Sequence, residues 1–576
     1  MVGDELPQRS AAAPGRPLIG PSPDDYPAWR IHHDGTFTSW PNEVHSTFAV
    51  SSEPRHSTVL GCVAMHNKAF IGAAAVVATG LTAVGLGGPA GADATELTPV
   101  AVFDSGDGDG GAEIVAIDTS TEQMYVTNGV ENQIDVVDIS DPTAPVAGTP
   151  IDLSPYGAGV QSVAAHTGLM AAAVESERAD GKGRVVVFDS DGNLLGNYLV
   201  GVLPDSIAFT PDGSAIVVAN EAEPVCVDDK LKRDPNGSIS IIRLDRGQVR
   251  TANFARWNDR VDELLADGVR IFFPGSTVAQ DLEPEYVAVS ADSSTAFVTL
   301  QENNAVAVVD IASAKVTDIL PLGYKDHSLV GNGLDPSNEN LGAVITTEPI
   351  LGMYMPDAIA VAELEGATHL LTANEGDARD YDCYSEEIRV KDFESGEGTL
   401  VGGVEALGLV VPPYGVDDLD DENLGRLKTT TAFPTMLNGD DQVDQIYAYG
   451  ARSFTIWAAD GSVVFDSGDD FEQITAPTPW YADNRADDKG PEPEALTVGE
   501  VDGKTYAFIG LERTGGIMMY DITDPNDALF VDYANTNDLG DISPEGIVFF
   551  EDEGTPYLAV SFEVSGTTRI FEIETD

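Results

Sequence analysis

Cysteine and histidine are scarce in this 576-residue sequence, which contains three cysteines and eight histidines. The cysteines form no Cys-x-x-Cys pair and the histidines show no His-Glu-x-x-His spacing, which argues against a zinc hydrolase. Because Cys62 precedes a predicted export signal, only Cys226 and Cys383 remain beyond it. Two cysteines exclude a disulfide framework but allow one bond. That bond requires the loops that carry them to extend toward each other, so the sequence leaves it open.

Positive charge is also scarce, since 30 Lys and Arg residues face 96 Asp and Glu residues and give a formal net charge of -66 at pH 7. Such a chain is repelled by nucleic acids and anionic membranes, so neither is expected as a partner. A salt-adapted surface accounts for most of these charges, and their mutual repulsion suggests a salty environment or bound cations. Neither a Gly-x-Ser-x-Gly elbow nor a P-loop occurs, which argues against two further enzyme classes.

A long apolar run, Ala69 to Leu86, follows Met65 and the short segment HNK. The small residues GGPAGADA come next, so residues 65–94 are predicted to be a signal peptide that is cleaved after Ala92 or Ala94. A transmembrane anchor fits less well, because the run is rich in Ala and Gly, is barely long enough and ends in a cleavage pattern. The sequence therefore predicts export.

The rest of the chain divides into two parts. Residues 1–64 show no sustained periodicity and are interpreted as an upstream extension, either disordered or not native to the protein. Residues 95–576 are predicted to form a single domain. The sequence ends at Asp576 with no sorting motif, hydrophobic tail or anchor domain, so we expect free secretion rather than covalent display, with no membrane insertion after signal cleavage.

A unit of fixed period recurs in residues 95–576, and its clearest element is an apolar run that usually ends in an acidic residue and a turn. Short runs rich in Val and Ile, bounded by Gly, Asp and Pro, are typical of β-strands. Seven such runs occur: IDVVDISDP from Ile134, VVVFDSDG from Val185, ISIIRLDRG from Ile239, VAVVDIAS from Val306, FTIWAADG from Phe454, IMMYDITDP from Ile517 and RIFEIETD from Arg569. They predict an all-β fold, a seven-bladed β-propeller of the YVTN or WD40 type. A short helix is expected only at 257–268.

The last unit ends after its third strand, near Ile573, and needs a fourth strand from elsewhere. The segment PVAVFDSGD from Pro99 matches GSVVFDSGD from Gly461, which stands at the fourth-strand position of the fifth unit. The N-terminal strand is therefore predicted to close the last blade and leave no open edge. Apart from any part of 245–282 that forms the fourth strand of the third unit, the insertions are predicted to lie on one face, where loops on a rigid scaffold carry function. They comprise 222–237, 245–282, 324–355, 382–444 and 473–491.

Five units carry an acidic residue at the start of the first strand and another at the end of the second, two positions that meet at one rim of a propeller channel. The pairs are Asp205 with Glu221, Glu285 with Glu302, Asp357 with Glu375, Glu494 with Glu512, and Glu545 with Glu563. The first unit offers Glu113 with Asn128, and the second only Glu175. Clustered carboxylates without nitrogen or sulfur ligands suit a hard divalent cation, above all calcium. Alternatively, each acid caps backbone amides or pairs with an arginine.

Several positive side chains stand beside these acids. They are Arg379, Arg389, Arg452, Lys489 and Arg513, with Asp380 and Asp488 next to two of them. Arginine beside metal-bound carboxylates would suit a phosphate or another anion, so Arg379, Asp380, Arg452, Asp488, Lys489 and Arg513 are the candidate catalytic residues of a metal-dependent phosphoesterase. An ion-pair network between neighbouring blades is the slightly stronger interpretation of the same residues.

Long motifs give the chain a family resemblance. DLEPEYVAVS, TLQENNAVAVVDIA, LTANEGDARDY, YGARSFTIW, ADDKGPEPEALTVG, GLERTGGIMMYDIT and SPEGI resemble the choice-of-anchor I domain family over about Thr95 to Asp576. That family includes mesenchyme-specific cell surface glycoproteins and members labelled alkaline phosphatase. The resemblance implies an extracellular or cell-surface β-propeller and transfers no site residue.

Three functions are open at this point. The leading hypothesis is a monomeric, secreted propeller that binds calcium at its acidic rim and presents its loops to an extracellular ligand or surface partner, such as a phosphorylated or anionic small molecule. The first alternative is a calcium-dependent phosphoesterase, which rests on analogy of fold. The second alternative is a purely structural extracellular protein in which the acids maintain blade packing.

Overall fold

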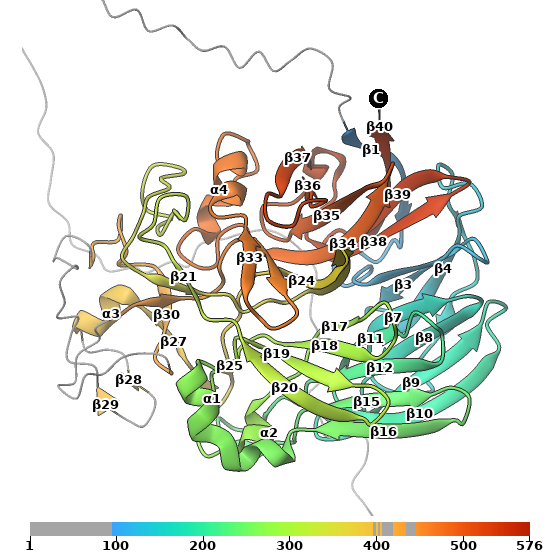
Figure 1. The fold of residues 1–576 in the computed structure, drawn as a ribbon, viewed down its shortest axis with the longest axis horizontal. Helices are drawn as coiled ribbons and strands as arrows, with labels where there is room; N and C mark the ends of the chain where they lie inside the picture. Colours follow the sequence, from blue (N-terminus) through green and yellow to red (C-terminus); the bar gives the residue numbers. More distant parts are fainter. Residues whose placement is uncertain (1–94, 396–398, 401–403, 406–418, 434–444, 576) are drawn as a thin grey trace, which may run out of the picture. The chain divides into compact units, whose positions relative to one another are not determined.

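The computed structural model describes residues 95–395, 399–400, 404–405, 419–433 and 445–575 (Figure 1). The chain divides into two compact units, residues 1–87 and 88–576, and all of the described residues belong to the second. The predicted upstream extension and signal peptide therefore lie outside the described residues.

The described chain is all-β, as the sequence predicts, and seven antiparallel sheets of four or five strands contain most of its strands. We number these sheets in the order in which their first hairpins occur along the chain, and we call the first strand of that hairpin the first strand of the sheet. Sheet 1 contains β2 (Val115–Asp118), β3 (Gln123–Asn128), β4 (Gln133–Asp138), β5 (Val146–Ala147) and β6 (Ile151–Asp152). Sheet 2 contains β7 (Val160–His166), β8 (Leu169–Val174), β9 (Lys182–Asp189) and β10 (Leu194–Val202). Sheet 3 contains β11 (Pro204–Phe209), β12 (Ala215–Asn220), β15 (Ser238–Arg243) and β16 (Gln248–Asn253).

The remaining four sheets follow the same order of pairing. Sheet 4 contains β17 (Val287–Val289), β18 (Thr295–Leu300), β19 (Ala305–Asp310) and β20 (Lys315–Pro321). Sheet 5 contains β23 (Ile359–Leu364), β24 (Ala367–Ala373), β32 (Phe454–Ala458) and β33 (Val463–Asp466). Sheet 6 contains β34 (Pro493–Val501), β35 (Lys504–Leu511), β36 (Ile517–Asp521) and β37 (Leu529–Ala534). Sheet 7 contains β38 (Pro544–Asp552), β39 (Thr555–Phe562), β40 (Thr567–Thr575) and, from the other end of the sequence, β1 (Thr95–Asp104).

The first strands of the seven sheets contact one another in succession. β2 contacts β7, β7 contacts β11, β11 contacts β17, β17 contacts β23, β23 contacts β34, β34 contacts β38, and β38 contacts β2. The second strands are buried along nearly their whole length; every residue of β12 is buried, for example. Apolar clusters fill the space between neighbouring sheets, as between sheets 3 and 4 and between sheets 6 and 7. Burial on both faces explains why these strands read as continuous apolar runs rather than as an alternating pattern.

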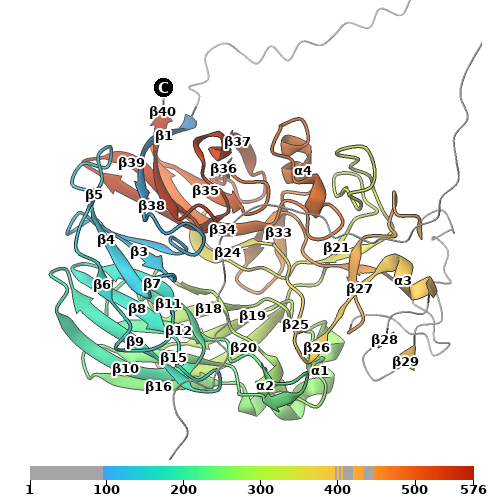
Figure 2. The same ribbon diagram turned by 180° about the vertical axis from the view of Figure 1, so that it is seen from behind.

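The insertions between the strands pack together beside the sheets, and β21 (Tyr324–Asp326), β27 (Glu387–Arg389) and α3 (Val390–Ser395) lie side by side in both views (Figures 1 and 2). Sheet 3 carries β13 (Val225–Cys226) and β14 (Leu231–Arg233), and η1 (Ala255–Arg260), α1 (Val261–Asp267) and α2 (Val278–Asp281) follow it. These bounds confirm the helix predicted at 257–268, which ends at Gly268 in the left-handed conformation (φ 100°) that glycine adopts at low cost.

The other insertions follow sheets 4, 5 and 6 or interrupt sheet 5. They contain β21 (Tyr324–Asp326), β22 (Leu351–Met353), β25 (Asp380–Tyr381), β26 (Tyr384–Ser385), β27 (Glu387–Arg389), α3 (Val390–Ser395), β28 (Thr399–Leu400), β29 (Val404–Glu405), β30 (Lys428–Thr430), β31 (Tyr447–Ala448), α4 (Asp470–Thr475), η3 (Asp483–Arg485) and η4 (Asn537–Leu539).

Cys226 and Cys383 form a disulfide, which decides the pairing that the sequence leaves open. Their Cα atoms lie 5.6 Å apart, and the bond joins the insertion of sheet 3 to the insertion of sheet 5 across 157 positions of sequence. Replacing both cysteines with serine is expected to lower the free energy of unfolding by about 2 to 4 kcal/mol, because the unfolded chain then regains the freedom of a very long loop. Urea unfolding of the double variant beside the wild type measures this loss. An unchanged midpoint would show that the bond constrains only loops that are already held by their other contacts.

Candidate functional site

The repeated acids stand at equivalent places in the sequence repeat, and in three of the sheets the same local geometry positions them. In sheets 3, 6 and 7, the register between the first and second strands shifts just after the opening proline, at Pro204, Pro493 and Pro544. Such a bulge places two residues against one and redirects a side chain. The residue after each of these prolines is the repeated Asp or Glu, beside the acid that follows the second strand.

All ten predicted acids line one cavity of about 540 Å³. They are Asp205, Glu221, Glu285, Glu302, Asp357, Glu375, Glu494, Glu512, Glu545 and Glu563. Three further acids join them: Glu223 and Asp377, which the sequence reasoning missed, and Asp380. Glu223 and Asp377 each stand two residues beyond a repeated glutamate, and this shared offset is a signal that could have identified them. Asp380 was a candidate catalytic residue, and here it is one of thirteen carboxylates.

The weaker units at the start of the chain do not extend this set. Glu113 lines an adjoining cavity of about 230 Å³ together with Asp205, Asp357, Glu545 and Glu563. Asn128 is buried and donates hydrogen bonds to the carboxylates of two aspartates, Asp107 and Asp135. Glu175 lines a third cavity with Glu223 and Cys226.

The cavity holds far more negative than positive side chains, since only Lys489 and Arg513 oppose its thirteen carboxylates. Burial, reinforced by neighbouring acids, raises the pKa of Glu113, Asp205 and Glu375 to about 7, although Lys489 opposes the rise at Glu375. Loss of water contact penalises the charged form of each group, and nearby like charges add to the penalty. The cavity therefore favours any species that brings positive charge, whether protons or a cation.

Within the cavity, two groups of three glutamates come especially close. Glu221, Glu285 and Glu302 form the Glu302 triad. Glu375, Glu494 and Glu512 form the Glu512 triad. In each triad, one carboxylate oxygen from every member lies within 4.8 Å of those from the other two. Three oxygen donors at this separation are the kind of ligand set that calcium accepts. The chemistry of the donors thus fits the predicted metal.

Arg379, a candidate for anion binding, is instead fully buried and paired. Its Nη1 lies 3.1 Å from Asp281 Oδ1, and its Nε lies 3.1 Å from Glu283 Oε2. Tyr381 donates a hydrogen bond to Glu283 as well, at 2.9 Å. These partners leave no free edge of the guanidinium for a phosphate, which argues against the predicted anion-binding role of Arg379.

Arg452 is also buried, and its guanidinium is likewise bonded to other groups of the chain. Its Nη1 donates to Glu472 Oε1 at 2.7 Å, and its Nη2 donates to the backbone oxygens of Ala486 and Asp488 at 2.8 and 3.1 Å. The Asp488 side chain lies apart from the cavity lining and pairs with Lys428 and Arg485. Arg389 pairs with Asp487. These ion pairs join insertion segments around sheet 5, so the network between neighbouring blades that the sequence favours stays a prediction.

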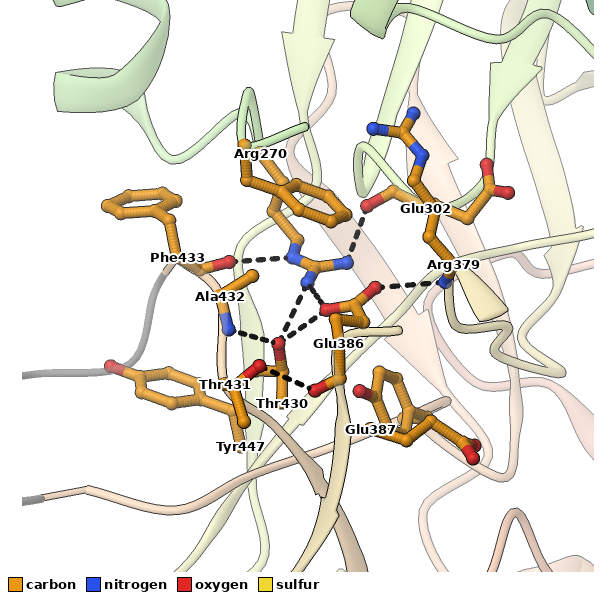
Figure 3. A network of polar contacts seen from close by, with 12 residues as sticks. Arg270, Glu302, Arg379, Glu386, Glu387, Thr430, Thr431, Ala432, Phe433 and Tyr447 are labelled. Carbon is orange, nitrogen blue, oxygen red and sulfur yellow. Dashed lines mark hydrogen bonds and ion pairs between the residues drawn. The ribbon is translucent and has the colours of Figure 1, made fainter. Parts of the chain in front are cut away.

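Another buried arginine, Arg270, was missed by the sequence reasoning. Figure 3 shows it between Glu386, with which it forms an ion pair, and the backbone oxygens of Phe433 and Glu302, at 2.9 and 2.6 Å. Glu386 also accepts a hydrogen bond from the backbone N–H of Arg379 at 3.1 Å. These contacts fasten the insertion of sheet 5 to the chain beside sheet 4, next to the acidic cavity.

None of the helices in the described part of the chain combines the length and the apolar character needed to cross a membrane.

The fold and the cavity together define an all-β domain built from repeated sheets whose first strands supply acids to a common cavity. The chain belongs to the choice-of-anchor I domain family, whose model matches residues 113–525. This match confirms the resemblance found in the sequence motifs.

Two curated relatives are similar over part of their length. The mesenchyme-specific cell surface glycoprotein of Strongylocentrotus purpuratus is 26% identical, over 56% of this chain and 46% of the relative. Gigasin-3a of Magallana gigas is 33% identical over 116 residues, 17% of this chain and 40% of the relative. The chain thus spans less than half the length of either relative.

Two solved structures are similar in outline. Kuenenia stuttgartiensis hydrazine synthase matches with a TM-score of 0.42 and 12% identity, over 81% of this chain and 97% of that one. The Cps50 (Swd1) β-propeller domain of Myceliophteria thermophila matches with a TM-score of 0.41 and 9% identity, over 83% and 100% of the two chains.

Proposed function

We propose that the seven sheets are the blades of a closed seven-bladed β-propeller whose last blade is completed by β1. The unbroken succession of contacts among the seven first strands supports this arrangement. So does the pairing of β1 with β40, in which Thr95 lies opposite Thr575. Closure of this kind pairs the strand edges that an open array would expose. It also explains why the acids of different sheets share one cavity.

We further propose that the protein is an extracellular recognition module that binds calcium in the acidic cavity. The single observation that carries this proposal is the lining of thirteen carboxylates against two cationic side chains. Carboxylate oxygens are ligands that calcium prefers, and a bound cation would relieve the repulsion among them. The signal peptide predicted at residues 65–94, and the cell-surface location in the name of the Strongylocentrotus purpuratus relative, support an extracellular setting.

The insertions beside the cavity would then contact the ligand or surface partner. Arg513 is the more exposed of the two lining cations; its side chain is 40% exposed and lies 2.8 Å from Glu512. An anionic ligand could therefore meet both a bound cation and Arg513 at the same opening. Phosphoester hydrolysis is not favoured by any single observation, because Arg379 and Arg452 are buried and occupied by other partners.

The test is the thermal stability of the secreted chain with calcium and after removal of calcium. Calcium that binds only the folded state at 100 times its dissociation constant would add about 2.7 kcal/mol to the free energy of unfolding. Magnesium at the same concentration is the control, and we expect a smaller effect because it demands a more regular octahedral set of ligands. A melting temperature that is unchanged by calcium would remove the metal from the proposal. Hydrolysis of a phosphoester substrate in the same samples would revive the enzyme alternative.

A further inference from the structure

The two triads occupy equivalent places in the repeat. In each, the glutamate that follows the second strand of one sheet meets both repeated acids of the next sheet. Glu221 of sheet 3 meets Glu285 and Glu302 of sheet 4 in the first triad, and Glu375 of sheet 5 meets Glu494 and Glu512 of sheet 6 in the second. If the charges around the two triads were the same, a cation would be expected to bind both with equal affinity.

The Glu512 triad already contains fixed positive charge. Lys489, which stands five residues before Glu494, forms an ion pair with Glu375 through its ammonium group. The same ammonium lies 3.5 Å from Asp377 Oδ1 and 3.5 Å from Glu492 Oε2. Arg513 pairs with Glu512 at 2.8 Å. A lysine and an arginine of the chain thus occupy the surroundings in which a metal ion would sit.

The Glu302 triad has no such partner among the described residues, since neither lysine nor arginine forms an ion pair with any of its three carboxylates. The nearby Arg379 is paired with Asp281 and Glu283, and Arg270 bonds the backbone oxygen of Glu302 rather than its side chain.

Two oxygens of the Glu302 triad also receive no hydrogen bond from a donor group of the described residues. Glu285 and Glu302 are 7% and 5% exposed, and the Oε2 atom of each is buried without such a donor. The two carboxylates instead face each other, a contact that only a shared proton or a cation makes favourable. Glu494 Oε2, in the other triad, is unpartnered as well, so the fixed cations and not this feature alone distinguish the two triads. A buried carboxylate oxygen without a partner is costly, and that cost is removed when a cation binds.

We propose that the Glu302 triad is the calcium site of the cavity and that Lys489 fills the equivalent place in the Glu512 triad as a built-in counter-ion. This inference rests on the proposed function and names its ligands: Glu221, Glu285 and Glu302. It also sets the stoichiometry, since the protein binds one ion tightly although its repeat supplies two similar groups of acids. The open cavity beside the triad leaves room for the water ligands that calcium needs to complete its shell.

Isothermal titration of the full secreted chain with calcium chloride tests the inference. The wild type is expected to bind one ion, and Glu302→Gln to weaken binding at least tenfold. Lys489→Gln is expected to raise the stoichiometry to two. Glu263→Gln removes an exposed acid that lies outside the cavity, so its affinity should change less than threefold.

The outcomes separate the two proposals. A wild type that takes up no calcium overturns the proposed function. A wild type that binds calcium, with Glu302→Gln binding as tightly, overturns only the assignment of the site, and a stoichiometry of one in Lys489→Gln overturns the role of Lys489. Should Lys489→Gln fail to fold, Glu221→Lys supplies a second test. It places a lysine in the Glu302 triad and is expected to abolish calcium binding while the metal-free protein melts no lower than the wild type.

Discussion

Replacing Arg379 with methionine is expected to lower the free energy of unfolding by about 3 to 5 kcal/mol, because it leaves two buried carboxylates without their counter-charge. Asp281 and Glu283 are both 1% exposed, and each lies 3.1 Å from the guanidinium. Water could hydrate these two carboxylates only if the insertion that carries Arg379 opened. Urea unfolding at neutral pH, with calcium held constant, measures the loss.

Two further variants make this prediction specific. Arg260 also pairs with a carboxylate, that of Glu263, but both side chains are exposed, so Arg260→Met should cost far less stability than Arg379→Met. Adding Glu283→Gln to Arg379→Met should recover part of the stability, since it removes one of the stranded charges. Equal losses for Arg379→Met and Arg260→Met would show that Arg379 is not held as a buried charge.

The calcium-depleted protein is expected to become less stable as the pH rises from about 5.5 to 7. Burial raises the pKa of Asp205 to about 7, above its ordinary value of 3.8, with a further contribution from Glu223. Between these two values the folded state holds a proton that the unfolded state has released, so raising the pH favours unfolding. The stability that protonation gives is fully present below the unfolded pKa and is lost as the pH rises through the folded pKa. Asp205 alone would account for about 1 to 2 kcal/mol over this range.

Thermal melts of the wild type and of Asp205→Asn across this pH range isolate the effect. The variant cannot titrate at this position, so its melting temperature should vary less with pH. His327 acts in the opposite sense and makes the comparison necessary: burial, with help from Lys325, lowers its pKa to about 3, so the stability it gives is lost as the pH falls below its ordinary value of 6.5. Identical slopes for the two proteins would mean that Asp205 is charged in the folded state at pH 6.

Much of the cavity follows from the sequence because it is built from a short-range pattern. In five of the sheets, a proline, an acid and, two positions after the acid, an aliphatic residue mark the start of the first strand, and a glutamate marks the end of the second. An antiparallel hairpin must bring those two positions together. Because the pattern recurs with each repeat, it predicts the lining acids from Asp205 in sheet 3 to Glu563 in sheet 7.

The partners of the arginines could not be read in the same way. Arg379 closely follows one of the repeated acids in the sequence, yet its carboxylate partners lie almost one hundred positions earlier. Arg270 and Glu386 are 116 positions apart, on insertions with no shared period. The direction in which such a side chain points depends on how two irregular segments pack. The sequence of neither segment indicates which other segment it contacts. The difference between the two triads has the same origin, since Lys489 stands outside the repeated strands.

The pairing of β1 with β40 also determines how the domain would bear a mechanical load. Thr95 and Thr575 are opposite each other at one end of an antiparallel ladder, whose hydrogen bonds run across the strands. A force that pulls these two residues apart would load the bonds one after another, as in opening a zip, rather than shear all of them at once. Sheet 7 is therefore where the domain would first give way under tension through residues 95 and 575, while the other six sheets, each built from a single stretch of chain, would stay outside the line of force.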